Sequence, residues 1–256
     1  MIPYVRRKQI LEEVEKKEIV YLEELAQTME NTSLSTIRRD LRTLAEEGQI
    51  ELLRGGGVRI KEDAYETPIE TKKMLNIEKK DQIARFAASL VNDGDVIYID
   101  SGTTVFEMIK YLKHKNIKVI TSNTKVIAEL DDAVFSCIVL GGEITKSIAS
   151  IAGPITETML GSMFFDKAFL GASGYSLKSG INTHDLKESK KKEIVKNNSA
   201  DTYVLADSSK ADRINFCRAF GLEECIIITD QSNEMLEQHA KYFIASELVK
   251  ENTPKA

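Results

Sequence analysis

The chain has 256 residues, a formal net charge of −5 and a pI near 5.5, and 42% of its residues are hydrophobic. This length exceeds one typical domain, so we expect two domains with substantial cores. The acidic balance excludes a protein that attracts nucleic acid by overall charge, so any such contact must come from a local group of cations. The first ten residues lack the apolar segment of a signal peptide, and no apolar run approaches the roughly 20 residues of a membrane span, which predicts a cytoplasmic protein.

The N-terminal residues predict two helices joined by a short extended segment. Apolar side chains recur at helical spacing over residues 5–17 and again over residues 22–29. Val20 and Tyr21 lie between them and favour a short strand. A turn at residues 30–32 then leads into a third helix.

The third helix, predicted from Ser33 to Leu44, carries the first indication of function. Ile37, Leu41 and Leu44 form its apolar stripe, and the hydroxyl of Ser33 is a suitable N-cap. Arginine can bind guanine edges and phosphates, and small hydroxyls can donate to phosphate oxygens. The opposite face therefore indicates either a DNA recognition helix or a solvated surface helix. Its members are Ser35, Thr36, Arg38, Arg39 and Arg42.

A hairpin is predicted directly after the third helix. Gly48 is expected to end that helix, and residues 49–53 and 58–60 can pair across the glycines at 55–57. Arg54 lies beside the tip of this hairpin. Such a hairpin after a recognition helix is called a wing, and its tip is expected to lie near the minor groove or a phosphate of DNA. Helix, helix, turn, helix and hairpin is the order of a winged helix-turn-helix domain. The residues expected to contact DNA are Ser33, Ser35, Thr36, Arg38, Arg39, Arg42 and Arg54.

Several segments of this region resemble the N-terminal domain of the DeoR family of bacterial transcription regulators. They are E-E-L-A at 23–26, S-T-I-R-R-D-L at 35–41, the pair Glu47-Gly48 and R-G-G-G at 54–57. The resemblance implies a DNA-binding regulator, with residues 1–60 as the winged helix-turn-helix domain. Residues 61–75, which are charged and contain Pro68, are interpreted as a linker.

After a first helix predicted over residues 76–91, apolar β-branched runs alternate with helical patterns. This alternation predicts an α/β domain over residues 76–256, with a mostly parallel sheet covered on both faces. The predicted strands are 96–99, 119–121, 136–140, 168–170, 203–205 and 226–229, and the predicted helices are 105–113, 125–130, 155–163, 186–197 and 233–238.

Ligands of such sheets bind at the carboxyl ends of the strands, where this sequence is rich in polar residues. D-S-G-T-T at 100–104 joins a strand to a helix, and its glycine, hydroxyls and amides would form a cradle for a phosphate. A plain strand-to-helix turn is the alternative. Asp207 and Lys210 suit a sugar hydroxyl and a phosphate. The residues expected to bind an effector are Asp100, Ser101, Gly102, Thr103, Thr104, Asn123, Gly141, Gly142, Asp207 and Lys210.

The same loops, in the same order, resemble the DeoR-family sensor domain. The matching segments are D-S-G-T-T at 100–104, S-N-T at 122–124, L-G-G at 140–142, F-L-G-A-S-G at 169–174 and A-D-S-S-K at 206–210. The resemblance implies a fold similar to pentose-phosphate isomerases, a phosphorylated sugar as effector, and a regulator of carbohydrate metabolism, most often a repressor. Because operators are usually symmetric, we expect a homo-oligomer, either a dimer or a tetramer.

A sugar-phosphate isomerase fused to a DNA-binding domain is the alternative function. Isomerisation requires a general base, and the related isomerases carry carboxylates in the loop that here reads G-A-S-G after Leu170. We therefore expect no catalytic residues. No cofactor or metal is expected, because His114, His184 and His239 lack metal-ligand spacing. The run K-E-S-K-K-K at 187–192 is interpreted as a solvated helix face, from which one lysine could reach the effector.

Overall fold

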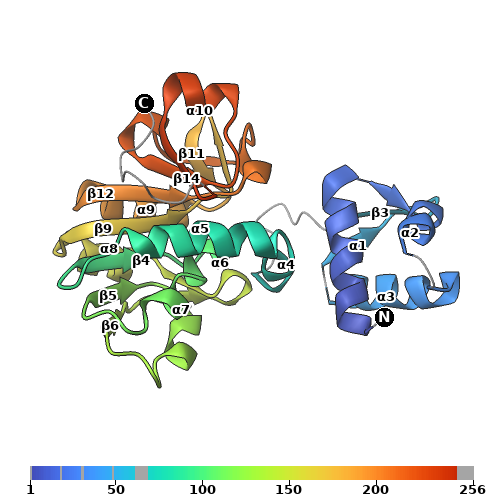
Figure 1. The fold of residues 1–256 in the computed structure, drawn as a ribbon, viewed down its shortest axis with the longest axis horizontal. Helices are drawn as coiled ribbons and strands as arrows, with labels where there is room; N and C mark the ends of the chain where they lie inside the picture. Colours follow the sequence, from blue (N-terminus) through green and yellow to red (C-terminus); the bar gives the residue numbers. More distant parts are fainter. Residues whose placement is uncertain (1, 18, 30–31, 48, 61–68, 247–256) are drawn as a thin grey trace. The chain divides into compact units, whose positions relative to one another are not determined.

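The computed structural model describes residues 2–17, 19–29, 32–47, 49–60 and 69–246. Contacts divide the chain into two compact units, Met1–Ile77 and Glu78–Ala256 (Figure 1). Each unit buries hydrophobic side chains of its own. Over these described residues, no helix is both long and apolar enough to cross a bilayer.

The N-terminal unit begins with three helices and a small antiparallel sheet, as expected for a winged helix-turn-helix domain. The sheet order is β1-β3-β2, so the predicted hairpin is confirmed, and it also pairs with the short strand that precedes the second helix. Residues 30, 31 and 48, from the expected turn and helix end, lie outside the described residues. The elements are α1 (Pro3–Lys17), β1 (Val20–Tyr21), α2 (Leu22–Thr28), α3 (Leu34–Glu46), β2 (Ile50–Leu52) and β3 (Gly57–Ile60).

Helix α3 begins where the sequence predicts. Ser33 has an extended conformation, and its hydroxyl accepts a hydrogen bond from the Thr36 amide at 3.2 Å. Ile37 and Leu44 are fully buried, and Leu41 is 5% exposed. This apolar stripe packs against α1 and α2, which leaves the opposite face of α3 pointing outward.

Part of the segment interpreted as a linker is folded. Residues 69–74 form helix α4 (Ile69–Met74), whose first residue is buried, and Leu75 belongs to the N-terminal core. The compact N-terminal unit consequently extends to Ile77 instead of ending at residue 60, because these apolar side chains have a core to enter. Residues 61–68 lie outside the described part of the chain.

The C-terminal unit is built on a seven-stranded sheet in the order β15-β14-β12-β9-β4-β5-β6, and every pairing in it is parallel. All six predicted strands belong to this sheet, and the edge strand β15 was not predicted. The strands are β4 (Val96–Ile99), β5 (Lys118–Thr121), β6 (Ser136–Val139), β9 (Phe165–Gly171), β12 (Ser199–Leu205), β14 (Ile226–Thr229) and β15 (Lys241–Ile244).

Helices cover both faces of this sheet. Alternate side chains of β4 enter different cores, with Ile97 and Ile99 on one face and Tyr98 on the other. The predicted class, a winged helix-turn-helix domain followed by a mostly parallel α/β domain, is confirmed (Figure 1). The first face is covered by α5 (Ile77–Ser89), α6 (Thr103–Phe106) and α7 (Ile109–Leu112), and the second by α8 (Pro154–Gly161), α9 (Leu186–Asn197) and α10 (Glu234–His239).

The shorter elements differ from the prediction. The helix predicted over 105–113 is divided into α6 and α7 by bonds of 3₁₀ type, such as that from the Met108 amide to the Val105 carbonyl. The helix predicted over 125–130 is the 3₁₀ helix η1 (Thr124–Glu129). Small antiparallel sheets were not predicted, because their strands are only three or four residues long. They consist of β7 (Glu143–Thr145) with β8 (Ser150–Ala152), and of β10 (Gly174–Ser176), β11 (Gly180–Thr183) and β13 (Cys217–Phe220); further 3₁₀ helices are η2 (Lys146–Ile148), η3 (Ser208–Lys210) and η4 (Leu222–Glu224).

Candidate functional site

The outward face of α3 carries the residues expected to bind DNA. Its arginines differ from nearby arginines of the same unit, because the nearby ones are in ion pairs. Arg7 pairs with Glu47 at 2.9 Å, and Arg59 pairs with Glu51 at 2.7 Å. In the described structure, no ion pair or side-chain hydrogen bond engages the arginines of the α3 face or the one at the wing tip. Their guanidinium groups are thus available to an external anion. These residues are Arg38, Arg39, Arg42 and Arg54, and all are exposed.

Hydroxyl groups gather at the start of α3, beside these arginines. The hydroxyl oxygen of Ser33 lies 2.9 Å from that of Ser35 and 2.8 Å from that of Thr36. Ser33 and Ser35 are exposed and Thr36 is half-buried. A hydroxyl can donate and accept at once, so the exposed pair keeps capacity for a phosphate oxygen. The predicted contact residues of α3 therefore share one surface.

A buried ion pair holds α3 against α1. The Arg6 guanidinium donates to both carboxylate oxygens of Asp40, and the two side chains are only 11% and 8% exposed. Asp40 follows Arg39 in sequence but lies on the buried side of the helix. The pair therefore fixes how α3 is rotated about its axis, and with it the direction of Arg38 and Arg39. Sequence reasoning missed this role, because nothing in the pattern marks Arg6 as the partner of Asp40.

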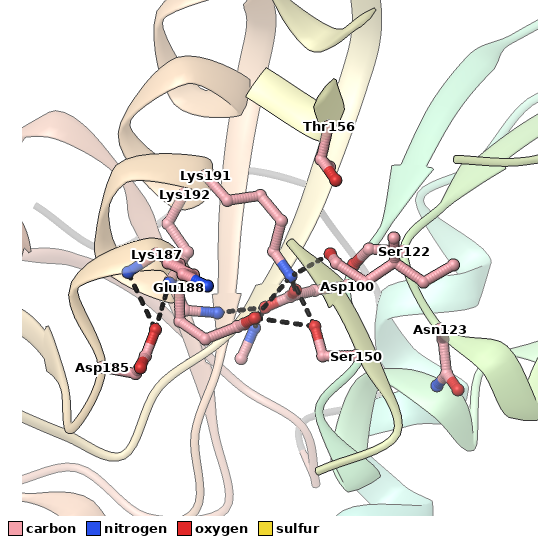
Figure 2. A network of polar contacts seen from close by, with 12 residues as sticks. Asp100, Ser122, Asn123, Ser150, Thr156, Asp185, Lys187, Glu188, Lys191 and Lys192 are labelled. Atoms are coloured by element: carbon pink, nitrogen blue, oxygen red, sulfur yellow. Dashed lines mark hydrogen bonds and ion pairs between the residues drawn. The ribbon is translucent and has the colours of Figure 1, made fainter. Parts of the chain in front are cut away.

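At the carboxyl ends of β4 and β9, the side chain of Asp100 connects three elements (Figure 2). It is fully buried, accepts a hydrogen bond from the Gly171 amide at 3.1 Å, and forms an ion pair with Lys192 of α9. Nζ of Lys191 lies 4.0 Å from Oδ1 of Asp100, an atom with no hydrogen-bond partner in the described structure. One carboxylate thus holds a strand end, a neighbouring loop and two buried ammonium groups in place.

Lys191 connects α9 to the β7–β8 hairpin. Its ammonium group donates to the hydroxyl of Ser150 at 2.6 Å, to the carbonyl of Ile151 at 3.2 Å and to Oε1 of Glu188 at 2.8 Å (Figure 2). The Ser150 hydroxyl also donates to Glu188 at 2.7 Å. All three N–H donors of Lys191 are therefore used within the chain, and two of these hydrogen bonds attach the β7–β8 hairpin to α9.

The interpretation of 187–192 as a solvated helix face is wrong for Lys191 and Lys192, which are 1% and 5% exposed. These lysines and the buried Glu188 and Val195 are spaced at i, i+3, i+4 and i+7, which is the spacing of a core-facing stripe. Three of its four members are charged, and their charge concealed the pattern. The spacing itself was the available signal for these functional residues.

Charge decides the protonation of Asp100. Burial alone would raise the pKa of this carboxyl, but the ammonium groups of Lys192 and Lys191 outweigh burial and hold the pKa at about 2. The carboxylate is therefore ionised under ordinary conditions. Because Asp100 and Glu188 balance the two lysines, the buried network carries no large excess of charge.

The loop at 100–104 joins β4 to α6, and its glycine lies against the end of β9. Ser101, Thr103 and Thr104 are 5%, 8% and 8% exposed at the start of α6. A Cβ on Gly102 would lie 3.4 Å from the Cα of Gly171, so the loops after β4 and β9 approach each other without side chains between them. A Cβ at this distance would make an ordinary van der Waals contact, so close packing of the two segments does not by itself require glycine at position 102.

Asn123, after β5, joins the same region. Its Oδ1 accepts a hydrogen bond from the Lys125 amide at 2.8 Å and caps η1, whereas its buried Nδ2 has no partner in the described structure. Asn123 also forms an isolated β-bridge with Ser150. The loops after β4, β5 and β9, the β7–β8 hairpin and α9 therefore meet at one edge of the sheet.

The remaining predicted effector residues lie in turns with structural roles of their own. Gly141 and Gly142 pack against α8: the Thr156 hydroxyl donates to the Gly141 carbonyl at 2.8 Å, and a Cβ on Gly142 would lie 2.1 Å from that hydroxyl oxygen. Asp207 is 1% exposed and accepts from the Ser209 amide at 3.0 Å, which caps the turn η3 that contains Lys210. Lys210 is half-buried.

A winged helix-turn-helix unit followed by a parallel α/β unit with polar strand ends defines a two-domain transcription regulator, and comparison with known proteins identifies its family. Residues 6–63 match the DeoR-like helix-turn-helix domain, and residues 75–231 match the DeoR C terminal sensor domain. The chain belongs to the DeoR family of DNA-binding transcription regulators.

Individual relatives extend over nearly the whole chain. The helix-turn-helix-type transcriptional regulator FruR of Bacillus subtilis is 35% identical, over 92% of this chain and 94% of its own. A lactose phosphotransferase system repressor of Lactococcus lactis is 34% identical, over 81% of this chain and 83% of its own. Among solved structures, ribose 5-phosphate isomerase A of Methanocaldococcus jannaschii is 21% identical with a TM-score of 0.39, over 53% of this chain and 55% of that chain.

We expect the ion pair of Asp100 to make stability depend on acidity. Because its folded-state pKa of about 2 lies below the ordinary 3.8, the carboxylate stabilises the fold above about pH 4, and this contribution is lost as the pH falls toward 2. Asp100→Asn should flatten the stability–pH curve in that window. At neutral pH it should also cost about 3–5 kcal/mol, because two buried lysines lose their partner.

Urea denaturation at a series of pH values measures both effects. Asp131→Asn is the matched control, since Asp131 is exposed and its curve should follow that of the unmodified chain. A parallel pH dependence for Asp100→Asn and the unmodified chain would contradict this account of the network.

Proposed function

We propose that this regulator represses a carbohydrate-metabolism operon and is controlled by a phosphorylated sugar. DNA binding is assigned to the N-terminal unit, Met1–Ile77, and effector binding to the C-terminal unit, Glu78–Ala256. The relative named as a lactose phosphotransferase system repressor supports a role in sugar use. The observation that carries the effector site is a pair of buried polar atoms that make no hydrogen bond within the described structure, Oδ1 of Asp100, whose contact with Lys191 is 4.0 Å long, and Nδ2 of Asn123.

A buried acceptor or donor left unpaired costs roughly 1–3 kcal/mol. A sugar offers hydroxyl groups, each of which can donate to Asp100 and accept from Asn123, so it would satisfy both kinds of atom. An apolar ligand would satisfy neither. The chemistry at this edge of the sheet therefore favours a polyhydroxylated ligand.

We assign the phosphate of this ligand to the loop 100–104, whose hydroxyls and amides surround the start of α6, and to the charge of Lys210. Lys191 and Lys192 already face two carboxylates, so we assign them to holding the loop and the β7–β8 hairpin. Asp207 is assigned to a sugar hydroxyl.

On the DNA side, we assign α3 to the major groove and the wing, with Arg54 at its tip, to the phosphate backbone or the minor groove. The arginines without internal partners support this assignment, because an exposed guanidinium already paired to a carboxylate would gain less from a phosphate. A symmetric operator would require two copies of the chain, so the regulator would act as a dimer or a larger homo-oligomer.

We further propose that the sensor binds sugar phosphates without converting them. The segment that joins β9 to β10 reads Gly171-Ala172-Ser173-Gly174 and offers no carboxylate. The ammonium groups of Lys192 and Lys191 lower the pKa of Asp100 and with it the basicity of this carboxylate, and Glu188 already accepts hydrogen bonds from Lys191 and Ser150. The isomerase alternative therefore lacks a suitable general base.

For DNA binding, we expect Arg38→Ala and Arg39→Ala each to weaken operator affinity. A base-reading arginine should cost about 1–3 kcal/mol, and a phosphate contact should lower the slope of affinity against salt by about one. Fluorescence anisotropy at several salt concentrations measures both quantities. Arg7→Ala is the matched control, because Arg7 is paired with Glu47, and its effect should be small. Unchanged affinity and salt slope in the Arg38→Ala/Arg39→Ala double variant would refute the recognition surface.

For effector binding, we expect Thr103→Ala and Lys210→Ala to raise the sugar-phosphate concentration needed for the operator response by ~10- to 100-fold, since a charge-assisted hydrogen bond is worth roughly 1.5–3 kcal/mol. Operator affinity without effector should stay near that of the unmodified chain, because a ligand acts only through its different affinities for the two states. Thr158→Ala and Lys178→Ala are exposed controls. Superimposable effector titrations for the test and control variants would remove the phosphate from this loop.

For catalysis, we expect no conversion of aldose phosphates to ketose phosphates. The purified chain incubated with ribose 5-phosphate and other aldose phosphates should yield no ketose above the rate without protein, while calorimetry detects binding of the responding sugar. The opposite result, sustained turnover that disappears in Glu188→Gln, would establish the isomerase alternative.

A further inference from the structure

Leu34 is an exposed leucine at a position where the helix offers it no core. It is the first residue of α3 and is 46% exposed, whereas the leucines of the buried stripe, Leu41 and Leu44, are 5% and 0% exposed. A single exposed leucine on a protein surface does not by itself indicate a function. The position of Leu34 beside the arginines without ion pairs does indicate one.

Residues four apart on a helix lie one above the other. Leu34, Arg38 and Arg42 therefore form one row along α3, and Leu34 is its N-terminal member. The row borders the buried stripe on one side and the exposed Ser35 and Arg39 on the other. Leu34 thus belongs to the surface that carries the guanidinium groups available to DNA.

The other side chains of the first turn are polar and partly occupied with one another. The Ser33 hydroxyl caps the Thr36 amide and contacts the hydroxyls of Ser35 and Thr36. Leu34 is consequently the apolar group that this end of the helix presents. Recognition helices place their N-terminal residues against base edges, and the apolar group on a base edge in the major groove is the 5-methyl of thymine.

We propose that Leu34 determines sequence specificity by packing against the 5-methyl group of a thymine in each operator half-site. The proposal rests on the assigned docking of α3 in the major groove. Burying one methyl group corresponds to about a fourfold change in affinity. Leu34 would therefore select thymine over cytosine, adenine or guanine at one position, beside the positions read by the arginines.

The experiment starts from DNA selected out of a random library by the full-length chain. In the selected site, each thymine is replaced in turn by uracil, which pairs with adenine in the same way but lacks the 5-methyl group. Binding is measured for the unmodified chain, for Leu34→Ala and for Val5→Ala, a control that shortens an exposed aliphatic side chain of α1. Because Leu34 is exposed, its truncation leaves the core intact, and the uracil series on the unmodified chain needs no substitution at all.

We expect one uracil position per half-site to weaken the unmodified chain and Val5→Ala about fourfold. Leu34→Ala should bind the thymine site about fourfold more weakly and should show no further loss with uracil at that position. Equal binding of every uracil site by the unmodified chain would overturn the proposal, as would an undiminished uracil penalty in Leu34→Ala. If Arg38→Ala/Arg39→Ala keeps full affinity for the selected site, the docking of α3 itself fails, and that outcome is separate from either result at Leu34.

Discussion

A buried aspartate holds together the parts of the C-terminal unit that carry its polar edge. Asp100 follows strand β4, accepts a hydrogen bond from the amide of Gly171 at the end of β9 and faces two lysines from α9. Removing any member would leave a charge or an amide buried without its partner, which is far more costly than the loss of a surface ion pair. The β7–β8 hairpin depends on the same group of residues, because Lys191 fixes Ser150 and the carbonyl of Ile151. The shape of the sheet edge is thus set by ionic contacts between segments far apart in sequence.

The N-terminal unit relies on a similar device on a smaller scale. Arg6 and Asp40 form a buried pair between α1 and α3, so the helix that presents the free arginines is positioned by an arginine that is not free. One arginine therefore holds the helix in place, and other arginines on that helix are exposed. Arg6 is distinguished from Arg38 only by what lies around it.

Much of this architecture could be predicted from the sequence, because it depends on local patterns. Helix α3 was predicted from its cap at Ser33 and from the apolar stripe of Ile37, Leu41 and Leu44. The strands were predicted from continuous β-branched runs. The predicted bounds of these elements agree with the observed bounds to within a few residues. The folding of residues 69–75 could not be predicted, because it depends on which core is within reach. The 3₁₀ hydrogen bonds that separate α6 from α7 could not be predicted either.

The candidate site was predictable in its loops but not in its network. The loop 100–104 and Asn123 were found because polar residues follow strands of a parallel sheet. Lys191, Lys192 and Glu188 were misinterpreted because charge usually marks solvent, and only their tertiary partners make their burial tolerable. For Gly102 and Gly142, the sequence indicated a need for close approach, but not that the approaching atoms belong to Gly171 and Thr156.

The strand order of the large sheet also has a consequence for how the chain is made. Strand β4 lies between β5 and β9, and its pairing with β9 joins Ile97 to Lys167 and Ile99 to Phe169. On the ribosome, β4 can pair with β5 once residue 121 has been synthesised, but its second neighbour, β9, is complete only at residue 171, whereas the N-terminal unit is complete at Ile77. At 5–20 residues per second, the stretch between these two points takes roughly 5–20 s. During translation, the helix-turn-helix unit is thus complete before the large sheet of the C-terminal unit can be assembled.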